Sequence, residues 1–434
     1  MAPPDVEFSA PLRLPSVIMS VKNVDTEKIL SEQNAGARGN ALGDALATLA
    51  PAVAAAAEAE PQGALANAVE VSRMLRDGKL AEVPTAFKFP EQMRATIAHD
   101  DFCDDKDIPV IDLTPVWAED GAGMEKLVDD IARACETSGF FHVVGHQVPD
   151  RCVKQMQAHG RKLFELPLDR KLQGSFAAGS TAQRRGYSCT PKTVTPSPAL
   201  IWQEGFTVLG GKTGQVDVES YAEKIWPDDV EQSKDFSQVY QEYAAHSMRL
   251  SLVLKDLLIK SLKVDPAHFE QYFESPMQVV HLTYYPPSPS PLEVMGLNPH
   301  YDMGFLTLIA QDDVPGLQLL GKDGNWFSVR PVPGAFCFNV ADSLEALSNG
   351  RFRSNLHRVL VNKERPRLSI STFLAPDFNK SVDPAPELVD DEHPRVYRPF
   401  TFGEYMSTIR GAHLDHITNC GHLLDLVRID ASTK

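Results

Sequence analysis

Apolar residues in the first half of the chain recur with a helical period. Within residues 124–135 they fall at 124, 127, 128, 131, 134 and 135, and residues 230–262 keep the same spacing over a much longer run. An apolar residue at every third or fourth position is typical of an amphipathic helix. We therefore expect helices in both segments, another at 150–164, and a short helix at 69–78 that ends at Gly78.

From position 277 onward the pattern becomes that of β-strands. Short apolar runs alternate with turn sequences at 313–316, 322–325 and 331–334 that are rich in Asp, Gly, Pro and Asn. A short helix is expected at 342–347, and helix returns at 402–426. The predicted strands are 277–285, 305–310, 317–320, 326–329, 335–340, 357–361 and 368–374, with two earlier ones at 108–113 and 140–144.

These patterns predict an α+β chain in three regions. Residues 1–70 form an Ala-rich extension with few large apolar residues, helical at most or disordered. Residues 71–265 form a helix-rich N-terminal region, and residues 266–434 form a β-core with a C-terminal helix. Within the helix-rich region, residues 167–228 are rich in Gly, Ser, Thr and Pro. We expect this loop-rich stretch to cover the active site.

Composition narrows the class of protein. The formal net charge of −16 argues against a nucleic-acid partner, and no apolar run approaches the length of a membrane-spanning helix. The N-terminus lacks the basic and apolar regions of a signal peptide. The six cysteines are scattered and contain no CxxC pair, which favours free thiols in a reducing compartment. We expect a cytoplasmic protein, and a monomer, without a nucleic-acid or membrane partner.

Two histidines and one aspartate supply the chemistry. His300 and Asp302 are two positions apart, which on a strand places both side chains on one face. His357 follows several predicted strands later, so a β-barrel or jelly roll could return it beside them. Two histidines and a carboxylate are the ligand set that holds Fe(II) on one face and leaves the opposite positions open. A lone His-x-Asp is weak, because it often occurs by chance.

A second pair makes the pattern more specific. Arg367 and Ser369 lie on the next predicted strand, again two apart and on one face. A guanidinium binds a carboxylate through two parallel hydrogen bonds, and a serine hydroxyl adds a third donor. The pair therefore suits the far end of a dicarboxylate whose 2-oxo acid end chelates the metal. Taken alone, such an arginine would more often form a surface ion pair.

Together these motifs resemble the iron- and 2-oxoglutarate-dependent dioxygenases, in particular the isopenicillin-N-synthase-like branch abundant in plants. The likeness runs from about Val69 to Gly411, and residues 326–336, 339–342 and 347–350 resemble the gibberellin-oxidase and flavonoid-oxidase groups. It implies a distorted double-stranded β-helix, or jelly roll, surrounded by helices. It also implies Fe(II), 2-oxoglutarate and O2, with ascorbate as a candidate reductant.

The resemblance also implies roles for individual residues. His300, Asp302 and His357 would be the iron ligands. Arg367 and Ser369 would bind the distal carboxylate of 2-oxoglutarate, and the Tyr285 hydroxyl would assist. The cosubstrate would be decarboxylated to succinate while a C–H bond of the substrate is hydroxylated or otherwise oxidised.

The sequence indicates the substrate less clearly than it indicates the metal and the cosubstrate. The resemblance favours a small, mostly apolar metabolite such as a gibberellin-type diterpenoid acid, with a flavonoid or other phenolic as the alternative. An iron oxidase of the same fold that uses no 2-oxoglutarate, or a non-catalytic receptor, stays open. Candidate residues of the substrate pocket are Phe305, Phe373, Tyr187 and Trp202, although aromatic residues at strand spacing more often belong to a core.

Overall fold

The computed structural model describes residues 80, 82–102, 108–118, 121–175, 186–189, 199–411 and 422–429. The chain divides into two units, Met1–Pro61 and Gln62–Lys434, and every described residue lies in the second. The predicted extension at 1–70 and the predicted helix at 69–78 fall outside the described residues. The region boundaries predicted at 70 and 265 remain predictions.

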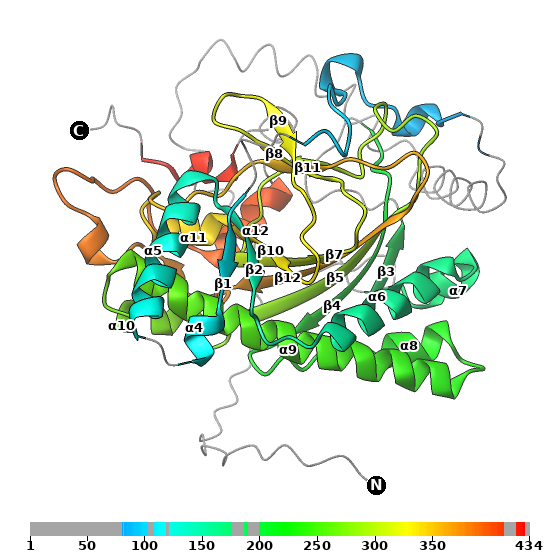
Figure 1. The fold of residues 1–434 in the computed structure, drawn as a ribbon, viewed down its shortest axis with the longest axis horizontal. Coiled ribbons are helices and arrows are strands. Elements are labelled where there is room, and N and C mark those ends of the chain that lie inside the picture. The colour runs from blue at the N-terminus through cyan, green and yellow to red at the C-terminus, as the bar shows by residue number, and fades with distance from the viewer. Residues whose placement is uncertain are drawn as a thin grey trace, which may run out of the picture. The chain divides into compact units, whose positions relative to one another are not determined.

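An eight-stranded sheet forms the centre of the fold (Figure 1). Its strands run in the order β1-β2-β10-β7-β12-β5-β4-β3, and all neighbours are antiparallel except β1 and β2. Strands from both halves of the sequence therefore share one sheet. Their bounds are β1 Val110–Asp112, β2 Phe140–Val144, β3 Gly186–Cys189, β4 Glu204–Gly210, β5 Met277–Tyr285, β7 Leu306–Gln311, β10 Phe336–Val340 and β12 Arg367–Ala375.

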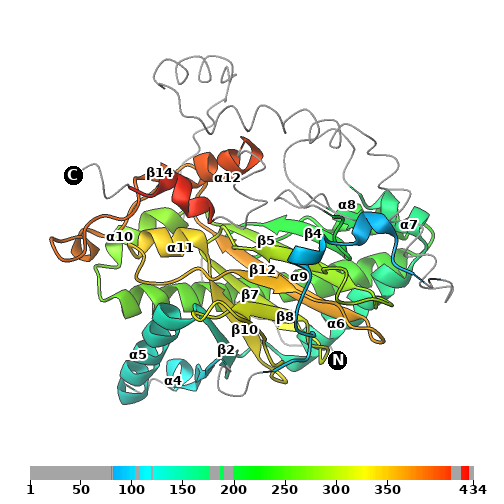
Figure 2. The ribbon, with the colours of Figure 1, turned by 90° about the horizontal axis from the view of Figure 1, so that it is seen from above.

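A smaller sheet lies over one face of the large sheet, as Figures 1 and 2 show. It has the order β6-β11-β8-β9, with bounds β6 Leu297–His300, β11 His357–Val359, β8 Leu317–Leu320 and β9 Trp326–Ser328. A third, two-stranded sheet pairs β13 (Ser381–Val382) with β14 (Phe400–Thr401). Two facing sheets with helices outside them confirm the predicted α+β fold with a jelly-roll core.

Helices cover the other face of the large sheet. The longest, α9 (Val230–Leu262), packs with α6 (Asp150–Glu165) against β5, β7 and β12. Asp229 caps the start of α9 by accepting a hydrogen bond from the Gln232 amide, and Lys263 ends it with a positive φ of 59°. The remaining helices are α4 Thr114–Trp117, α5 Gly121–Thr137, α7 Leu168–Gln173, α8 Glu219–Ile225, α10 Ala267–Glu270, α11 Asp342–Leu347 and α12 Phe402–Gly411, with 3-10 turns at Thr85–Phe87, Glu91–Met93, Gln271–Phe273, Pro386–Leu388 and Leu423–Val427.

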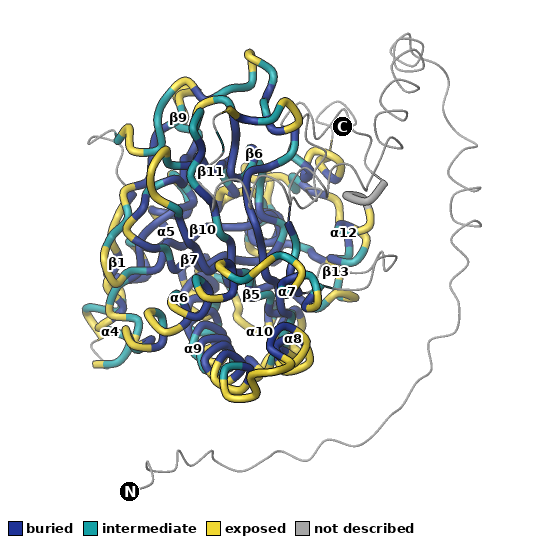
Figure 3. Tube along the Cα trace, turned by 90° about the vertical axis from the view of Figure 1, so that its right-hand side faces the viewer, coloured by how far each residue is buried: buried dark blue, intermediate teal, exposed yellow. Residues whose placement is uncertain are grey.

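The main hydrophobic core lies between these helices and the sheet. Apolar side chains of α9 such as Phe236, Tyr240 and Leu254 are buried there, together with Phe206 and Leu282 from the strands. In Figure 3 the central strands are mostly dark and buried, whereas α8 and α9 below them carry exposed stretches. Among the helices that the structure describes, none has the length and apolar character needed to cross a membrane.

Two sequence predictions need correction. Residues 167–228 are not simply loops, because they contain α7, β3, β4 and α8, and β3 and β4 extend the large sheet. The C-terminal segment is not one continuous helix, since α12 ends at Gly411 and the described residues resume as a 3-10 turn at Leu423–Val427. In the first case short strands were hidden between Gly- and Pro-rich stretches, where local composition outweighs the strand signal.

A buried charged cluster ties this added part of the sheet to α7. Lys171 is fully buried, and its Nζ contacts a carboxylate oxygen of Glu204 and donates to the Phe164 carbonyl at 3.0 Å. The Tyr187 hydroxyl donates to the same carboxylate at 2.6 Å. Burial, followed by the charge of Glu204, raises the pKa of Tyr187, so its hydroxyl stays protonated as a donor.

We expect Lys171→Met to destabilise the protein by about 3 kcal/mol or more, because it leaves the buried Glu204 carboxylate without its cation. Chemical unfolding of the purified protein measures this. The double variant Lys171→Met/Glu204→Gln should recover part of the loss, since it removes the buried charge as well. Equal stability of the single and double variants would contradict the assigned role of the ion pair.

Candidate active site

Two histidines face each other across the small sheet. His357 of β11 is the cross-strand partner of His300 of β6, and the ring centroids are 4.1 Å apart. In each ring Nδ1 lies within hydrogen-bond distance of a carbonyl two residues earlier: Asn298 O at 2.9 Å and Asn355 O at 3.0 Å. With Nδ1 donating to these carbonyls, each Nε2 is left as an acceptor that can bind a metal.

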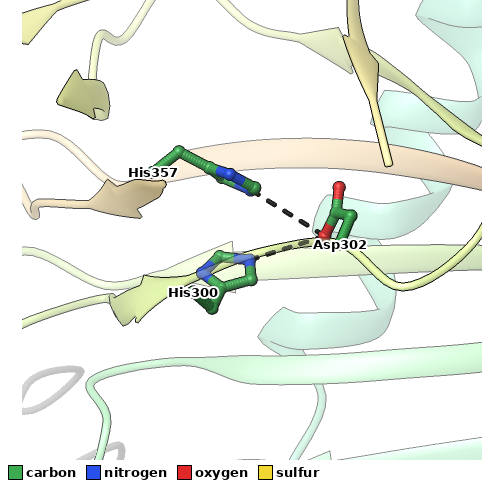
Figure 4. A group of neighbouring side chains, drawn as sticks. All are labelled: His300, Asp302 and His357. Carbon is green, nitrogen blue, oxygen red and sulfur yellow. Dashed lines mark ion pairs between the residues drawn. The ribbon is translucent and has the colours of Figure 1, made fainter. Parts of the chain in front are cut away.

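Asp302 completes the group (Figure 4). Its Oδ1 lies 3.6 Å from His300 Nε2 and 3.8 Å from His357 Nε2. Its Oδ2 accepts hydrogen bonds from Thr307 Oγ1 at 2.6 Å and Asn339 Nδ2 at 2.8 Å. Those donors stand on β7 and β10 of the large sheet, so one oxygen is held by the sheet and the other points at the two imidazoles. One ligand atom from each residue lies within 4.8 Å of the others.

The environment keeps this group ready for a cation. Burial, together with the neighbouring His357, lowers the pKa of His300 to about 4, although Asp302 opposes the shift. Burial would raise the pKa of Asp302, but the two histidines and the hydrogen bonds from Thr307 and Asn339 lower it overall. At neutral pH the site therefore offers a neutral His300 imidazole and an ionised carboxylate, which are the forms that bind a divalent metal.

Tyr301, which lies between His300 and Asp302 in the sequence, points away from the two imidazoles. Tyr301 stacks on His422, with ring centroids 3.9 Å apart, and His422 Nε2 lies 2.8 Å from Asp342 Oδ1. The Asp342 amide in turn donates to the Asp302 carbonyl at 2.7 Å. Asp302 itself lies just after β6, which ends at His300, so these contacts and not a regular strand place its side chain.

Arg367, Ser369 and Tyr285 meet on the same inner face of the large sheet. Arg367 pairs with Tyr285 across β12 and β5, and its guanidinium carbon lies 5.2 Å from the tyrosine ring centroid. Ser369 pairs with Gln311 of β7, four residues beyond Thr307, which places both on the side that holds Asp302. Cross-strand partners share a face, so the predicted pair at 367 and 369 and the triad face one space.

The Arg367 guanidinium is built to receive an anion. The residue is only 2% exposed, and its Nη2 donates to Gln311 Oε1 at 3.1 Å. Its Nε and Nη1 have no hydrogen-bond partner among the described residues. A Cβ at Gly316 would lie 2.9 Å from Arg367 Cδ, so the glycine leaves room for the side chain. A buried cation with two unused donors costs free energy unless a ligand satisfies it, and a carboxylate fits that need.

The four residues predicted to line a substrate pocket occupy different places. Phe373 is half-buried on the inner face, where it is the cross-strand partner of Thr307. Trp202 is buried beside Tyr285, donates through Nε1 to the Pro286 carbonyl, and meets Phe87 edge-on. Phe305 packs against Phe273 in the main core. The pocket role of all four remains a prediction.

The fourth, Tyr187, is not brought to the triad. It is the cross-strand partner of Phe206 on the helix-covered face, where its hydroxyl donates a hydrogen bond to Glu204.

The sequence analysis did not find Thr307 and Asn339, which donate hydrogen bonds to Asp302. Their only sequence signal is a polar side chain in the middle of an otherwise apolar strand.

The inner face of β4, β5 and β12 is partly open. Several of its residues are half-buried, whereas residues between them on the other face, such as Val208, Val280 and Thr372, are buried. This alternation indicates that part of the inner face is accessible. We call these half-buried residues the floor: Leu209, Val279, His281, Ser371 and Phe373.

Comparison with known proteins agrees with this geometry. Residues 276–376 match the 2OG-Fe(II) oxygenase superfamily, and residues 108–229 match the N-terminal region of a non-haem dioxygenase in morphine synthesis. Gibberellin 20 oxidase 1-D of Triticum aestivum is 34% identical over 322 residues, which cover 74% of this chain and 86% of that protein. The chain belongs to the 2OG-Fe(II) oxygenase superfamily.

Two further proteins are similar to the oxygenase over most of its length. Oxoglutarate-dependent flavonoid 7-O-demethylase 1 of Ocimum basilicum is 30% identical over 372 residues, which cover 84% of this chain and 93% of that protein. The crystal structure of JOX2 with 2OG, Fe and JA superimposes with a TM-score of 0.66 at 26% identity, covering 83% of this chain and 97% of that one. The oxygenase is thus an enzyme that uses Fe(II) and 2-oxoglutarate, as the sequence predicted.

We expect Thr307→Val to weaken metal binding about tenfold or more, because Asp302 loses one of the two donors that orient it. Anaerobic titration of the oxygenase with Co(II), followed by absorbance, measures the affinity. Thr372→Val is the matched control: the same change on a neighbouring strand, equally buried but on the opposite face. An equal loss of affinity in both variants would mean that the effect is structural and does not pass through Asp302.

Proposed function

We propose that His300, Asp302 and His357 bind the iron of this oxygenase, and that Arg367, Ser369 and Tyr285 bind the distal carboxylate of 2-oxoglutarate. The observation that carries the second assignment is the buried Arg367 guanidinium, with two donors that no described residue uses. When bound, the metal and cosubstrate supply the oxidising chemistry, and 2-oxoglutarate leaves as succinate and carbon dioxide. The protein's own groups orient the cosubstrate and exclude water around it.

We propose further that the substrate is a small, mostly apolar molecule, and specifically a gibberellin-type diterpenoid acid. The likeness to the wheat gibberellin 20 oxidase supports this class. The floor fits it as well, because Leu209, Val279 and Phe373 offer apolar surface beside the hydroxyl of Ser371 and the ring of His281. A flavonoid or other phenolic is the second candidate, supported by the likeness to the basil flavonoid demethylase.

The proposed setting is the cytoplasm, with the enzyme acting as a monomer. Four of the six cysteines lie among the described residues, and all four are free and buried. Free thiols are the usual state of cysteine in a reducing compartment.

We expect Arg367→Ala to raise the KM for 2-oxoglutarate about 100-fold, since a buried carboxylate would lose its charged partner. Fe(II)-dependent succinate formation, with ascorbate present, measures this. Arg365→Ala is the matched control, because Arg365 is two residues away but exposed, paired only with Asp313 at the surface. A KM unchanged by Arg367→Ala would move the cosubstrate site elsewhere.

We expect succinate formation by the wild-type enzyme to rise when a gibberellin-type diterpenoid acid is added, and to vanish in His300→Ala with or without it. The assay pairs succinate with mass spectrometry of the acid, which should gain oxygen or lose hydrogen. Stimulation by flavonoids and not by diterpenoid acids would replace the first substrate class with the second.

A further inference from the structure

The guanidinium proposed to bind 2-oxoglutarate is itself held by a neighbouring strand. Arg367 Nη2 donates a hydrogen bond at 3.1 Å to Oε1 of Gln311, the last residue of β7. Gln311 is the cross-strand partner of Ser369, so its side chain lies on the inner face beside both proposed cosubstrate residues. Gln311 is therefore placed to control the direction in which this guanidinium points.

The backbone that carries Arg367 is fixed by the residue after Gln311. Asp312 holds Leu368 twice, because its amide donates to the Leu368 carbonyl at 3.2 Å and its Oδ2 accepts from the Leu368 amide at 2.7 Å. The same Oδ2 accepts a hydrogen bond from Arg161 of α6 at 3.0 Å, and the Asp312 side chain is buried. Leu368 lies directly after Arg367 in the chain, so the arginine side chain starts from a fixed backbone.

Contacts along the arginine side chain restrict it further. A Cβ at Gly316 would lie 2.9 Å from Arg367 Cδ and 3.3 Å from its Nε, so the stem passes close to the backbone of this glycine. Gln157 of α6 donates through Nε2 to the Gln311 carbonyl at 3.3 Å, which ties the end of β7 to the helix. The hydrogen bond to Gln311 Oε1 then limits rotation of the planar guanidinium. The Nε and Nη1 atoms, which have no hydrogen-bond partner among the described residues, are left for a ligand.

The acceptor at position 311 is neutral, and this matters for binding an anion. A glutamate there would form an ion pair with the guanidinium and would repel a second carboxylate. An amide oxygen accepts the same hydrogen bond without adding a negative charge. We propose that Gln311 is a positioning residue for the cosubstrate, which orients the Arg367 guanidinium toward the distal carboxylate of 2-oxoglutarate without neutralising it. The inference rests on the cosubstrate site proposed above, and it adds a determinant of selectivity for 2-oxo acids that carry a second carboxylate.

The test compares 2-oxoglutarate with 2-oxopentanoate, which has the same carbon chain but lacks the distal carboxylate. Calorimetry with Mn(II) measures the Kd of each ligand for wild type, Gln311→Leu and Gln311→Glu. We expect Gln311→Leu to raise the Kd for 2-oxoglutarate about tenfold, as loss of a hydrogen bond to a charged group predicts. The Kd values for 2-oxopentanoate and for Mn(II) alone should stay unchanged.

Gln311→Glu tests the need for a neutral acceptor. It preserves the shape of the side chain and the hydrogen bond, yet it should raise the Kd for 2-oxoglutarate more than Gln311→Leu does, because the new carboxylate competes with that of the ligand. In succinate assays the KM for 2-oxoglutarate should rise in the same order, with a much smaller change in kcat. Wild-type affinity in Gln311→Glu would overturn the positioning role, and so would equal losses for 2-oxoglutarate and 2-oxopentanoate in Gln311→Leu.

Gln318→Leu is the matched control. Gln318 Oε1 accepts a hydrogen bond from the buried Arg358 Nε at 2.9 Å, so the same substitution removes the same kind of bond from the small sheet. The next residue, Leu319, is the cross-strand partner of His357, so Gln318 points to the opposite face of that sheet. This variant should keep the wild-type Kd for 2-oxoglutarate. A loss as large as that in Gln311→Leu would mean that the effect is structural.

Arg367→Ala separates failure of this inference from failure of the proposed cosubstrate site. An unchanged Kd for 2-oxoglutarate in Arg367→Ala would overturn the site, and the role of Gln311 with it. Weaker binding in Arg367→Ala, with wild-type binding in both Gln311 variants, would leave the site standing and overturn the positioning role alone. If Gln311 acts through Arg367, the double variant Arg367→Ala/Gln311→Leu should bind 2-oxoglutarate no more weakly than Arg367→Ala. Additive losses would contradict the proposal.

Discussion

The hydrogen bonds that Asp302 Oδ2 accepts from Thr307 and Asn339 join the two sheets at the proposed metal site. The two histidines come from the small sheet and the donors come from the large one. Because the carboxylate is shared between them, the separation of the sheets is fixed where a metal would bind. The segment of Tyr301 and Asp302 that follows β6 is also held by a hydrogen bond from the Asp342 amide and by the stacking of Tyr301 on His422. A carboxylate oriented in this way loses little freedom when it binds a cation.

The alternation of side chains along the large sheet separates packing from chemistry. Outward-facing residues of β5 and β12, such as Val280, Leu282 and Ile370, are buried beneath α6 and α9. Inward-facing residues of the same strands bear hydroxyls, an imidazole and the Arg367 guanidinium. A slip of one residue in the pairing of β5 with β12 would exchange these two faces. The long, regular register of these strands is therefore as important for the site as any single side chain.

Much of this arrangement was predictable from the sequence. Arg367 and Ser369 lie two apart on one strand, and period-two alternation is enough to place them on one face. His300, Asp302 and His357 come together as the predicted ligand set, but Asp302 follows β6 outside any strand, so the alternation does not explain its position. The strand at 277–285 was predicted with its observed bounds, because a long run of Val, Leu, Thr and Tyr leaves little ambiguity. The long helix at 230–262 was equally clear from its period.

The rest depends on contacts that sequence spacing does not encode. Glu204 becomes a buried partner of Lys171 and Tyr187 only because β3 and β4 join the large sheet, and their surroundings read as loops. Asn339 reaches Asp302 from a strand far along the chain. Such partners are set by tertiary pairing, which local pattern leaves open.

The inner face carries two proposed binding sites, one for 2-oxoglutarate and one for the substrate. Arg367 is almost fully buried and close to Tyr285, which suits the proposed binding of a carboxylate there. The floor is half-buried, and none of its five side chains is a lysine or an arginine. It therefore suits apolar groups of a ligand better than charged ones. The two proposed sites therefore differ in depth as well as in charge, with the carboxylate site at the buried Arg367 and the substrate site on the half-buried floor.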